Sequence, residues 1–386
     1  MRKMGFVIFF SIFFLVYFGA NYYVFIRGWQ GISGFPALRI PYTVAFIYLA
    51  IAYILMRFLG QYLPAVLSTV LYWSGSFWFA ALLFSFLVVL SLDMLRLADH
   101  FIHFLPVAGS AAYLKYKGIV TFGSIVLVCM LLAAGYINTL FPATRHFTFE
   151  INRPNSSFRQ VKLALASDIH MGTMVGKRRV ASMVKMINAN EPDLVVLAGD
   201  LLDEIHEPIF RNDVGAPLRE LKAPLGVYAI NGNHEYIGGV ESSVKYIQSL
   251  GVSMLRDTVV KPGGDIYLAG REDRSKGGRF DGARRKPLAE LLQGIDKNDP
   301  VILLDHQPHN FNEVVKNNVD LQLSGHTHHG QFWPFSALTR AMYELSWGYL
   351  KKGNTQFYVT NGFGTWGPPI RLGNRPEIAI ITLVNR

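Results

Sequence analysis

The sequence contains a single cysteine, Cys129, which lies inside a long apolar run. One thiol excludes a disulfide within the chain and a metal site built from several cysteines. Acidic residues are also scarce, with 27 Asp and Glu against 37 Lys and Arg, which gives a net charge of +10. Internal repeats, low-complexity tracts and a basic low-complexity arm are all missing, so neither a repeat architecture nor a flexible nucleic-acid-binding tail is indicated.

Charge is missing altogether from four stretches of the first 144 residues. A helix of roughly 20 apolar residues crosses the hydrocarbon core of a bilayer, so residues 1–144 are predicted to form about four membrane helices. The first stretch is also similar to a secretory signal peptide, but the three later stretches favour an uncleaved helix. The third is long enough for a fifth segment or one long tilted helix. The four stretches are 4–26, 40–56, 58–92 and 118–144.

Most of the excess positive charge belongs to this apolar part, because residues 1–140 hold eight Lys and Arg against two Asp and Glu. Cationic residues beside membrane helices suit anionic lipid head groups, so a lipid bilayer is the expected partner and nucleic acid is not. We expect a multi-pass protein of the cell (inner) membrane. Arg2 and Lys3 favour a cytoplasmic start of the chain. An even number of crossings would put the second domain on the same side, so a cytoplasmic second domain is expected. Basic residues in a later loop argue against this orientation.

Beyond Pro142 the pattern changes from continuous apolar runs to short β-rich runs separated by helical segments. Residues 161–167 and 193–199 read as strands, and the segment between them has apolar residues at helical spacing from Val180 to Ile187. Strand, helix and strand in repetition predict an α/β domain. We expect a polar linker at 145–160 and a second domain at 161–386.

Five of the predicted strands end in metal-capable side chains. Loops at the carboxyl ends of strands converge in open α/β sheets, so these clusters can meet in one pocket. Residues two apart, such as Asp168 and His170, are expected on the same side of an extended chain. Such a set of ligands exceeds what one tetrahedral ion takes and suits two ions with a shared carboxylate. The clusters are Asp168 and His170 in SDIH, Asp200 and Asp203 in AGDLLD, Asn233, His234 and Glu235 in NGNHEY, His306 in LLDHQP, and His326 and His328 in GHTHHGQ.

In this order, DIH, GDLLD, GNHE, H and GHTH resemble the D-x-H, G-D-x-x-D, G-N-H-[DE], H and G-H-x-H blocks of calcineurin-like metallophosphoesterases. The resemblance covers the chain from about residue 160 to its C-terminus. GQ at 330–331 and NGFGTWGPPIRLGNRPEI are similar to the branch that joins such a domain to membrane segments or secretion signals. The resemblance implies a four-layer αββα sandwich with a dimetal site at one edge of its two sheets.

The resemblance also implies a role for each matching residue. Asp200 would bridge two metals, and His234 would contact the phosphoryl oxygen or protonate the leaving group. Asp203 would orient the His234 ring, with a helix N-cap or turn as its alternative role. The implied ligands are Asp168, His170, Asp200 and His328 for one metal, and Asp200, Asn233, His306 and His326 for the other.

The implied activity is phosphoester hydrolysis by metal-activated hydroxide, without a phospho-enzyme. Two divalent ions are expected, with Mn2+ favoured over Fe or Zn. Attachment to a membrane favours a phosphodiester or pyrophosphate substrate on a lipid or nucleotide. The alternative is a catalytically silent binding or signalling module on a membrane anchor, which the intact ligand set disfavours.

Other polar residues near these motifs are expected to lie outside the site. Arg271 and Asp273 follow a strand and read as a solvated loop, with a position lining the cleft as the alternative. His329 reads as a residue behind the ligands or exposed, and not as a seventh ligand. His206 and His309 read as surface or capping residues. Four aromatic residues are expected near the site loops, where they either contact acyl chains or pack in the core. They are Phe332, Trp333, Phe363 and Trp366.

Overall fold

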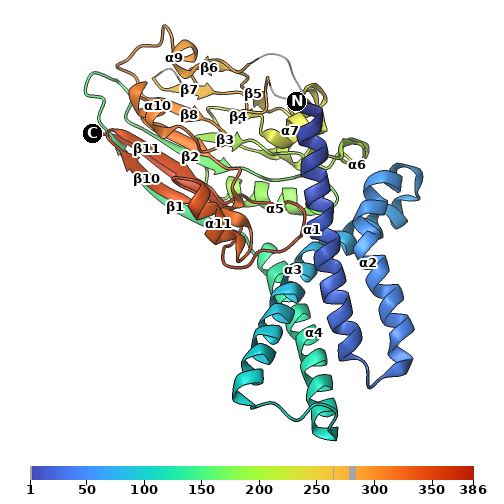
Figure 1. The fold of residues 1–386 in the computed structure, drawn as a ribbon. Coiled ribbons are helices and arrows are strands. Elements are labelled where there is room, and N and C mark those ends of the chain that lie inside the picture. Colours follow the sequence, from blue (N-terminus) through green and yellow to red (C-terminus); the bar gives the residue numbers. More distant parts are fainter. Residues whose placement is uncertain (1, 264, 278–283) are drawn as a thin grey trace. The chain divides into compact units, whose positions relative to one another are not determined.

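The computed structural model describes residues 2–263, 265–277 and 284–386 (Figure 1). The chain divides into two compact units. The first comprises Met1–Tyr136 with Gly367–Pro369, and the second comprises Ile137–Trp366 with Ile370–Arg386.

Long helices make up the first unit. Three segments of the described residues are long and apolar enough to cross a membrane: Pro36–Tyr62, Ala65–Ile102 and Ala111–Thr139. The first long helix is not among these three, so a count of about four crossings stays a prediction. The elements are α1 (Arg2–Gly31), η1 (Pro36–Leu38), α2 (Arg39–Leu59), η2 (Gly60–Tyr62), α3 (Ala65–Ile102) and α4 (Ala111–Thr139).

The long apolar run at 58–92 lies mostly within one helix, since α3 continues for 38 residues from its N-cap, Pro64. Gly75 allows close packing against α2, because a Cβ there would lie 2.4 Å from the backbone nitrogen of Tyr53. The long helix, and not a fifth segment, is therefore what forms. Helix α4 begins at Ala111, before the charge-free run, so Lys115 and Lys117 are helical.

Among the described residues, the second unit contains two six-stranded sheets, which Figure 1 shows with the helices that accompany them. The first sheet has the order β1-β12-β2-β3-β4-β5 and the second has the order β10-β11-β9-β8-β7-β6. The strands of the first sheet are β1 (Ala143–Ile151), β2 (Gln160–Ala166), β3 (Leu194–Ala198), β4 (Val227–Ile230), β5 (Ser253–Met254) and β12 (Glu377–Asn385). Those of the second are β6 (Thr258–Val260), β7 (Tyr267–Gly270), β8 (Val301–Leu304), β9 (Leu321–Ser324), β10 (Gly348–Lys352) and β11 (Thr355–Val359).

Strand β1 occupies part of the stretch expected to be a linker. It pairs in parallel with β12, from Ala143 opposite Glu377 to Ile151 opposite Asn385. As an edge strand it leaves much of its surface exposed, and only Phe149 and Ile151 are buried. This polar character explains why its sequence resembles a linker.

The two sheets face each other across one core, since side chains from β2 and β3 pack together with side chains from β8 and β9. Helix α5 (Lys177–Asn188) connects the parallel neighbours β2 and β3 and buries its expected apolar face. Helices α9 (Leu288–Leu291) and α10 (Phe311–Lys316) pack on the other face of the second sheet. The predicted αββα arrangement is therefore confirmed. The remaining elements are α6 (His206–Arg211), η3 (Ala216–Glu220), α7 (Asn233–Gly238), α8 (Val240–Ser249), η4 (His328–Gly330) and α11 (Phe335–Met342).

Candidate metal centre

The strands that precede the polar clusters are parallel within each sheet, with β2, β3 and β4 in the first and β8 and β9 in the second. Parallel strands end at the same edge of a sheet, so the loops that follow them converge. The fold therefore places the loops after five strands at neighbouring sheet edges, and these loops carry the predicted site residues.

The backbone of these loops is left-handed and not extended. The φ angles are 53° at Asp168, 50° at His170, 51° at Asp200, 71° at His326 and 46° at His328. Positive φ is uncommon for residues other than glycine, and such strain gathers at functional sites. The extended geometry expected for Asp168 and His170 is therefore wrong, and tight turns direct these side chains into the site.

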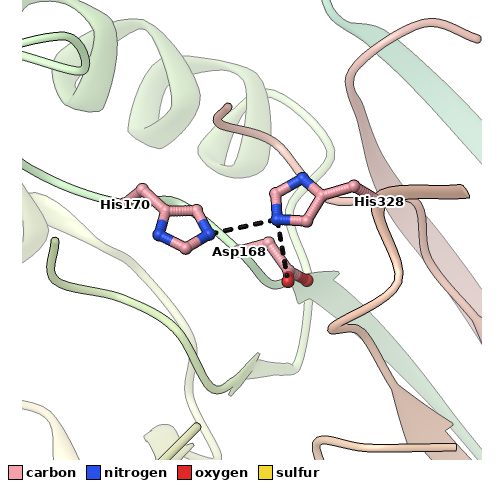
Figure 2. A group of neighbouring side chains, drawn as sticks. All are labelled: Asp168, His170 and His328. Atoms are coloured by element: carbon pink, nitrogen blue, oxygen red, sulfur yellow. Dashed lines mark hydrogen bonds and ion pairs between the residues drawn. The ribbon is translucent and has the colours of Figure 1, made fainter. Parts of the chain in front are cut away.

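The first group of ligand-capable side chains contains Asp168, His170 and His328 (Figure 2). The Nε2 atoms of His170 and His328 are 3.1 Å apart, and His328 Nε2 lies 3.3 Å from Asp168 Oδ1. All three residues are buried, and one ligand atom from each lies within 4.8 Å of the others. Two imidazole nitrogens and a carboxylate oxygen thus converge on one point.

The second group contains Asp200, His306 and His326. His306 Nε2 lies 3.1 Å from Asp200 Oδ2, and Asn233 Oδ1 lies 2.8 Å from His326 Nδ1. Asp200 Oδ2 is also 4.0 Å from Nε2 of His170 in the first group. The structure therefore brings the predicted ligands together in two adjacent groups with Asp200 between them, and their roles as ligands stay predictions.

The environment of His306 fits a cation. Its Nδ1 donates to the carbonyl oxygen of Ala198 at 2.7 Å, so Nε2 is left to face Asp200 Oδ2 at 3.1 Å. Burial alone would lower the pKa of His306, but the carboxylates of Asp200 and Asp168 hold it well above its usual value. Burial, followed by the charge of Asp200, raises the pKa of Asp168 to about 6. The carboxylates of this pocket therefore stabilise a positive charge at Nε2, and either a proton or a divalent ion can supply that charge.

The histidines of the first group behave differently. Burial holds the pKa values of His170 and His328 well below the usual value for histidine. Their rings are therefore neutral and offer lone pairs, as binding of a transition metal requires. The buried carboxylates and neutral imidazoles together form a mixed nitrogen and oxygen ligand set that suits Mn, Fe or Zn.

The predicted catalytic residue His234 lies beside the first group. Its ring centroid is 4.6 Å from that of His170, and its Nδ1 is 3.7 Å from Glu204 Oε1. Asp203 has a carboxylate oxygen within 4.8 Å of ligand atoms of both His170 and His234. The sequence motif predicts that Asp203 orients the His234 ring. The structure adds Glu204 as a second candidate for this role.

Glu235 has a structural role that the sequence did not reveal. It is fully buried and accepts four backbone hydrogen bonds, from Asp200, Leu201, Leu202 and Gly232. A Cβ at Gly232 would lie 2.2 Å from Asp200 Oδ1, so no side chain fits there. Burial and then the Asp200 carboxylate raise the pKa of Glu235 to about 7. Glu235 therefore holds the turn that presents Asp200.

Arg371 is another residue that the sequence reading missed. It is fully buried, and its Nη2 lies 3.1 Å from His328 Nδ1. It also donates to the carbonyls of Gly362 and Gly364, and the Gly364 N–H donates to the Asp168 carbonyl at 2.8 Å. Burial lowers the pKa of Arg371 to about 10, which leaves it charged at neutral pH. Arg371 thus supports two of the predicted ligands, His328 and Asp168, from behind.

The prediction of a solvated loop at Arg271 and Asp273 is wrong. Both are buried, because Arg271 pairs with Asp305 at 3.2 Å and Asp273 accepts from the amide of Gln307 at 3.0 Å. His329 is buried too, with its Nδ1 3.0 Å from Ser346 Oγ, and it belongs to neither group of predicted ligands.

Two histidines expected at surface or capping positions, His206 and His309, belong to neither of the two ligand groups. His206 begins α6, and the His309 ring lies 5.0 Å from the ring of Tyr343. Both side chains are partly exposed, as expected for surface or capping positions.

Comparisons with known proteins identify relatives of this chain. A model of the calcineurin-like phosphoesterase family matches residues 161–330. A metallophosphoesterase of Aquifex aeolicus is 32% identical over 262 residues, covering 67% of this chain and 98% of that protein. A metallophosphoesterase of Helicobacter pylori is 36% identical over 228 residues, which is 58% of this chain. The chain therefore spans about 60% of that relative's length. A Danio rerio transmembrane protein with metallophosphoesterase domain is 32% identical over 272 residues, covering 67% of this chain and 62% of that protein.

Proposed function

The chain belongs to the calcineurin-like phosphoesterase family, and we propose that it is a membrane-anchored phosphohydrolase that uses two divalent metal ions. The observation that carries the proposal is the pair of buried ligand groups that meet at Asp200. A shared carboxylate between two groups of nitrogen and oxygen ligands is the arrangement that a two-metal hydrolase needs. The apolar helices of the first unit, three of which are long and apolar enough among the described residues to cross a membrane, would supply the membrane anchor.

Seven residues would hold the ions. Bound divalent ions would neutralise the charge of the phosphoryl group and acidify a water molecule for attack. Asp168, His170 and His328 would hold one ion, and Asn233, His306 and His326 the other. Asp200 would contact both. Contact with the phosphoryl oxygen and protonation of the leaving group would depend on other side chains of the protein.

His234 would place its ring against the phosphoryl oxygen or protonate the leaving group. It is 5% exposed and packs against both His170 and the Trp366 ring, which limits its motion and keeps water away. A carboxylate at Asp203 or Glu204 would hold the ring in one orientation. No serine or cysteine nucleophile is required, so hydrolysis would proceed without a covalent phospho-enzyme.

Mn2+ is the metal we propose, with Fe or Zn as alternatives, because mixed nitrogen and oxygen sites accept all three. The proposed substrate is a phosphodiester or pyrophosphate attached to a lipid or nucleotide, since a membrane anchor keeps the site near amphipathic molecules. We place the protein in the cell (inner) membrane with its catalytic domain in the cytoplasm, following the basic start at Arg2 and Lys3.

The test is hydrolysis of bis-p-nitrophenyl phosphate and p-nitrophenyl phosphate by the detergent-purified chain. The protein is assayed after metal removal and again with added Mn2+, Zn2+ or Fe2+. We expect metal-dependent hydrolysis of the diester that is lost in Asp200→Ala and kept in Asp296→Ala, which changes an exposed carboxylate.

Two results would count against the proposal in different ways. If two ions bind but neither ester is hydrolysed with any metal, the activity on simple phosphoesters is refuted. If no ion binds, the assignment of metal ligands is wrong, and a binding or signalling module on a membrane anchor replaces the hydrolase.

A further inference from the structure

Large apolar side chains gather on the surface at α11 and the two loops beside it. Trp333 is 57% exposed, Leu338 is 55% exposed and Met342 is 64% exposed. Apolar side chains scattered singly on a surface need no explanation, but a continuous group marks an interaction site. We call this group the apolar rim, and its members are Trp333, Phe335, Leu338, Met342 and Trp366.

The apolar rim lies beside the candidate metal centre at two places, through its member Trp366 and through Tyr343, which follows Met342. At one end, the Trp366 ring lies 5.9 Å from the ring of His234. Two hydrogen bonds between Gln331 and the backbone of Trp366, at 2.8 and 3.0 Å, tie that loop to the start of the segment that carries Trp333. At the other end, Tyr343 directly follows α11 and its ring lies 6.2 Å from that of His326.

Helix α11 presents its large side chains outward. Phe335, Leu338 and Met342 share one face because they are three and seven residues apart. The small residue Ser336 is the one that the helix buries. A helix that packs on a protein core shows the opposite arrangement, with its large apolar side chains buried.

The aromatic residues near the site divide into two pairs. Phe332 and Phe363 are 5% and 1% exposed, so they pack in the core and are closed to a ligand. Trp333 and Trp366 are more than half exposed. Tryptophan is enriched at membrane interfaces because its ring is apolar and its N–H is polar.

Charge on this segment is of one sign. Residues 331–342 contain Arg340, which is exposed, and no Asp or Glu. Apolar residues on one helical face with a cation nearby favour the boundary between lipid head groups and acyl chains. Exposed tryptophans also occur at protein–protein interfaces, but this chain has helices long and apolar enough to cross a membrane, which favours a lipid surface as the occupant.

We propose that the apolar rim inserts into the surface of the lipid bilayer and opens the metal centre to the phosphoester of a membrane lipid. This inference rests on the proposed hydrolase function and names its substrate class as a lipid within the bilayer. The rim member Trp366 has its ring 5.9 Å from that of His234, so a lipid with its acyl chain on the rim would bring its phosphoryl group toward the predicted ligands.

The test measures contact with lipid on the full chain in nanodiscs. Cys129 is replaced by serine, and single cysteines at Leu338→Cys or Met342→Cys carry a fluorescent label. Lys185→Cys, on the exposed side of α5, is the matched control. Quenching is compared between nitroxide-labelled phosphatidylcholine in the nanodisc and iodide in solution.

We expect lipid quenching at positions 338 and 342 and little at 185, with iodide quenching in the reverse order. A shallow nitroxide should quench more strongly than one at the end of the acyl chain, since interfacial helices lie about 5–10 Å into the head-group boundary. If iodide quenches positions 338 and 342 as strongly as 185, these positions face water and the proposal is wrong. If neither quencher reaches them, a second copy or another part of the chain covers the rim, which also overturns it.

A charge substitution separates this inference from the hydrolase proposal. Leu338→Glu should abolish lipid quenching of the label at position 342, whereas Leu338→Met should preserve it. Leu338 is 55% exposed and is neither a predicted ligand nor a predicted catalytic residue, so both variants should hydrolyse bis-p-nitrophenyl phosphate, a water-soluble ester, at the wild-type rate. Hydrolysis without lipid contact refutes only the membrane insertion, whereas lipid contact without hydrolysis refutes only the enzymatic function.

Discussion

Replacement of Glu235 by glutamine should destabilise the catalytic domain without removing any predicted metal ligand. Each carboxylate oxygen of Glu235 accepts two backbone hydrogen bonds: Oε1 from Leu201 and Leu202, and Oε2 from Asp200 and Gly232. In Glu235→Gln one oxygen becomes an NH2 group, which faces two N–H donors and accepts from neither. Two buried donors therefore lose their partners.

The size of the effect follows from these two donors. A buried donor without a partner costs about 1–3 kcal/mol, so the variant should lose about 2–6 kcal/mol of the free energy of unfolding. For a domain of this size each kcal/mol lowers the melting temperature by about 2–4 °C, which gives a fall of about 4–24 °C. Glu235→Ala leaves all four donors unpaired and should cost about 4–12 kcal/mol, comparable with the whole stability of a typical domain.

Differential scanning calorimetry of the detergent-purified chain measures this shift. The work is done at about pH 8, where Glu235 is ionised because its pKa is about 7. Glu241→Gln is the control: this side chain is 77% exposed and pairs with Arg256, so its removal should cost no more than about 1 kcal/mol. A melting temperature for Glu235→Gln equal to that of Glu241→Gln would refute the reasoning, as would a folded Glu235→Ala that binds metal normally.

Three further predictions concern the metal centre. Protons compete with metal for Asp168, whose pKa is about 6, so the Mn2+ affinity of the first site, measured by isothermal titration calorimetry, should fall by about tenfold for each pH unit below 6. The pKa of His306 is raised well above its usual value, so the second site should begin to lose affinity at a higher pH than the first. Asp203→Asn should lower kcat for bis-p-nitrophenyl phosphate by about 10–100-fold and shift its pH profile, whereas Glu204→Gln should not; the reverse would identify Glu204 as the partner of His234, the predicted catalytic histidine. Arg371→Lys should weaken the first metal site by about 10–100-fold, so that elemental analysis finds one ion per chain where the wild type holds two; two tightly held ions would contradict this.

The sequence predicts most residues of the candidate metal centre because these residues lie at the ends of strands. A strand followed by Asp168, Asp200, Asn233, His306 or His326 is visible in the pattern of apolar and polar residues, and parallel strands leave few places for those loops to go. The precise turns are not visible, because left-handed φ angles at residues other than glycine depend on the surrounding fold. For that reason the sequence indicates the proximity of Asp168 and His170, but gives a wrong backbone conformation for them.

Residues that act through the backbone are harder to predict from the sequence. Glu235 lies in a recognisable motif, but its four partners are N–H groups that every residue carries. Arg371 is fully buried, which is rare for arginine and has no signature in a single sequence. Phe332 and Trp333 are adjacent and similar in chemistry, yet one is buried and the other exposed. Tertiary packing alone decides such differences.

The two ligand groups also explain why the domain would depend on its metals. Asp168 and His170 follow a strand of the first sheet, and His328 follows a strand of the second. The second group is divided in the same way, because Asp200 follows a strand of the first sheet, whereas His306 and His326 follow strands of the second sheet. Each ion would therefore join both sheets at the edge where the loops have left-handed backbone. Since ligands that bind the folded state stabilise it by mass action, metal removal should loosen this edge before it affects the core between the sheets.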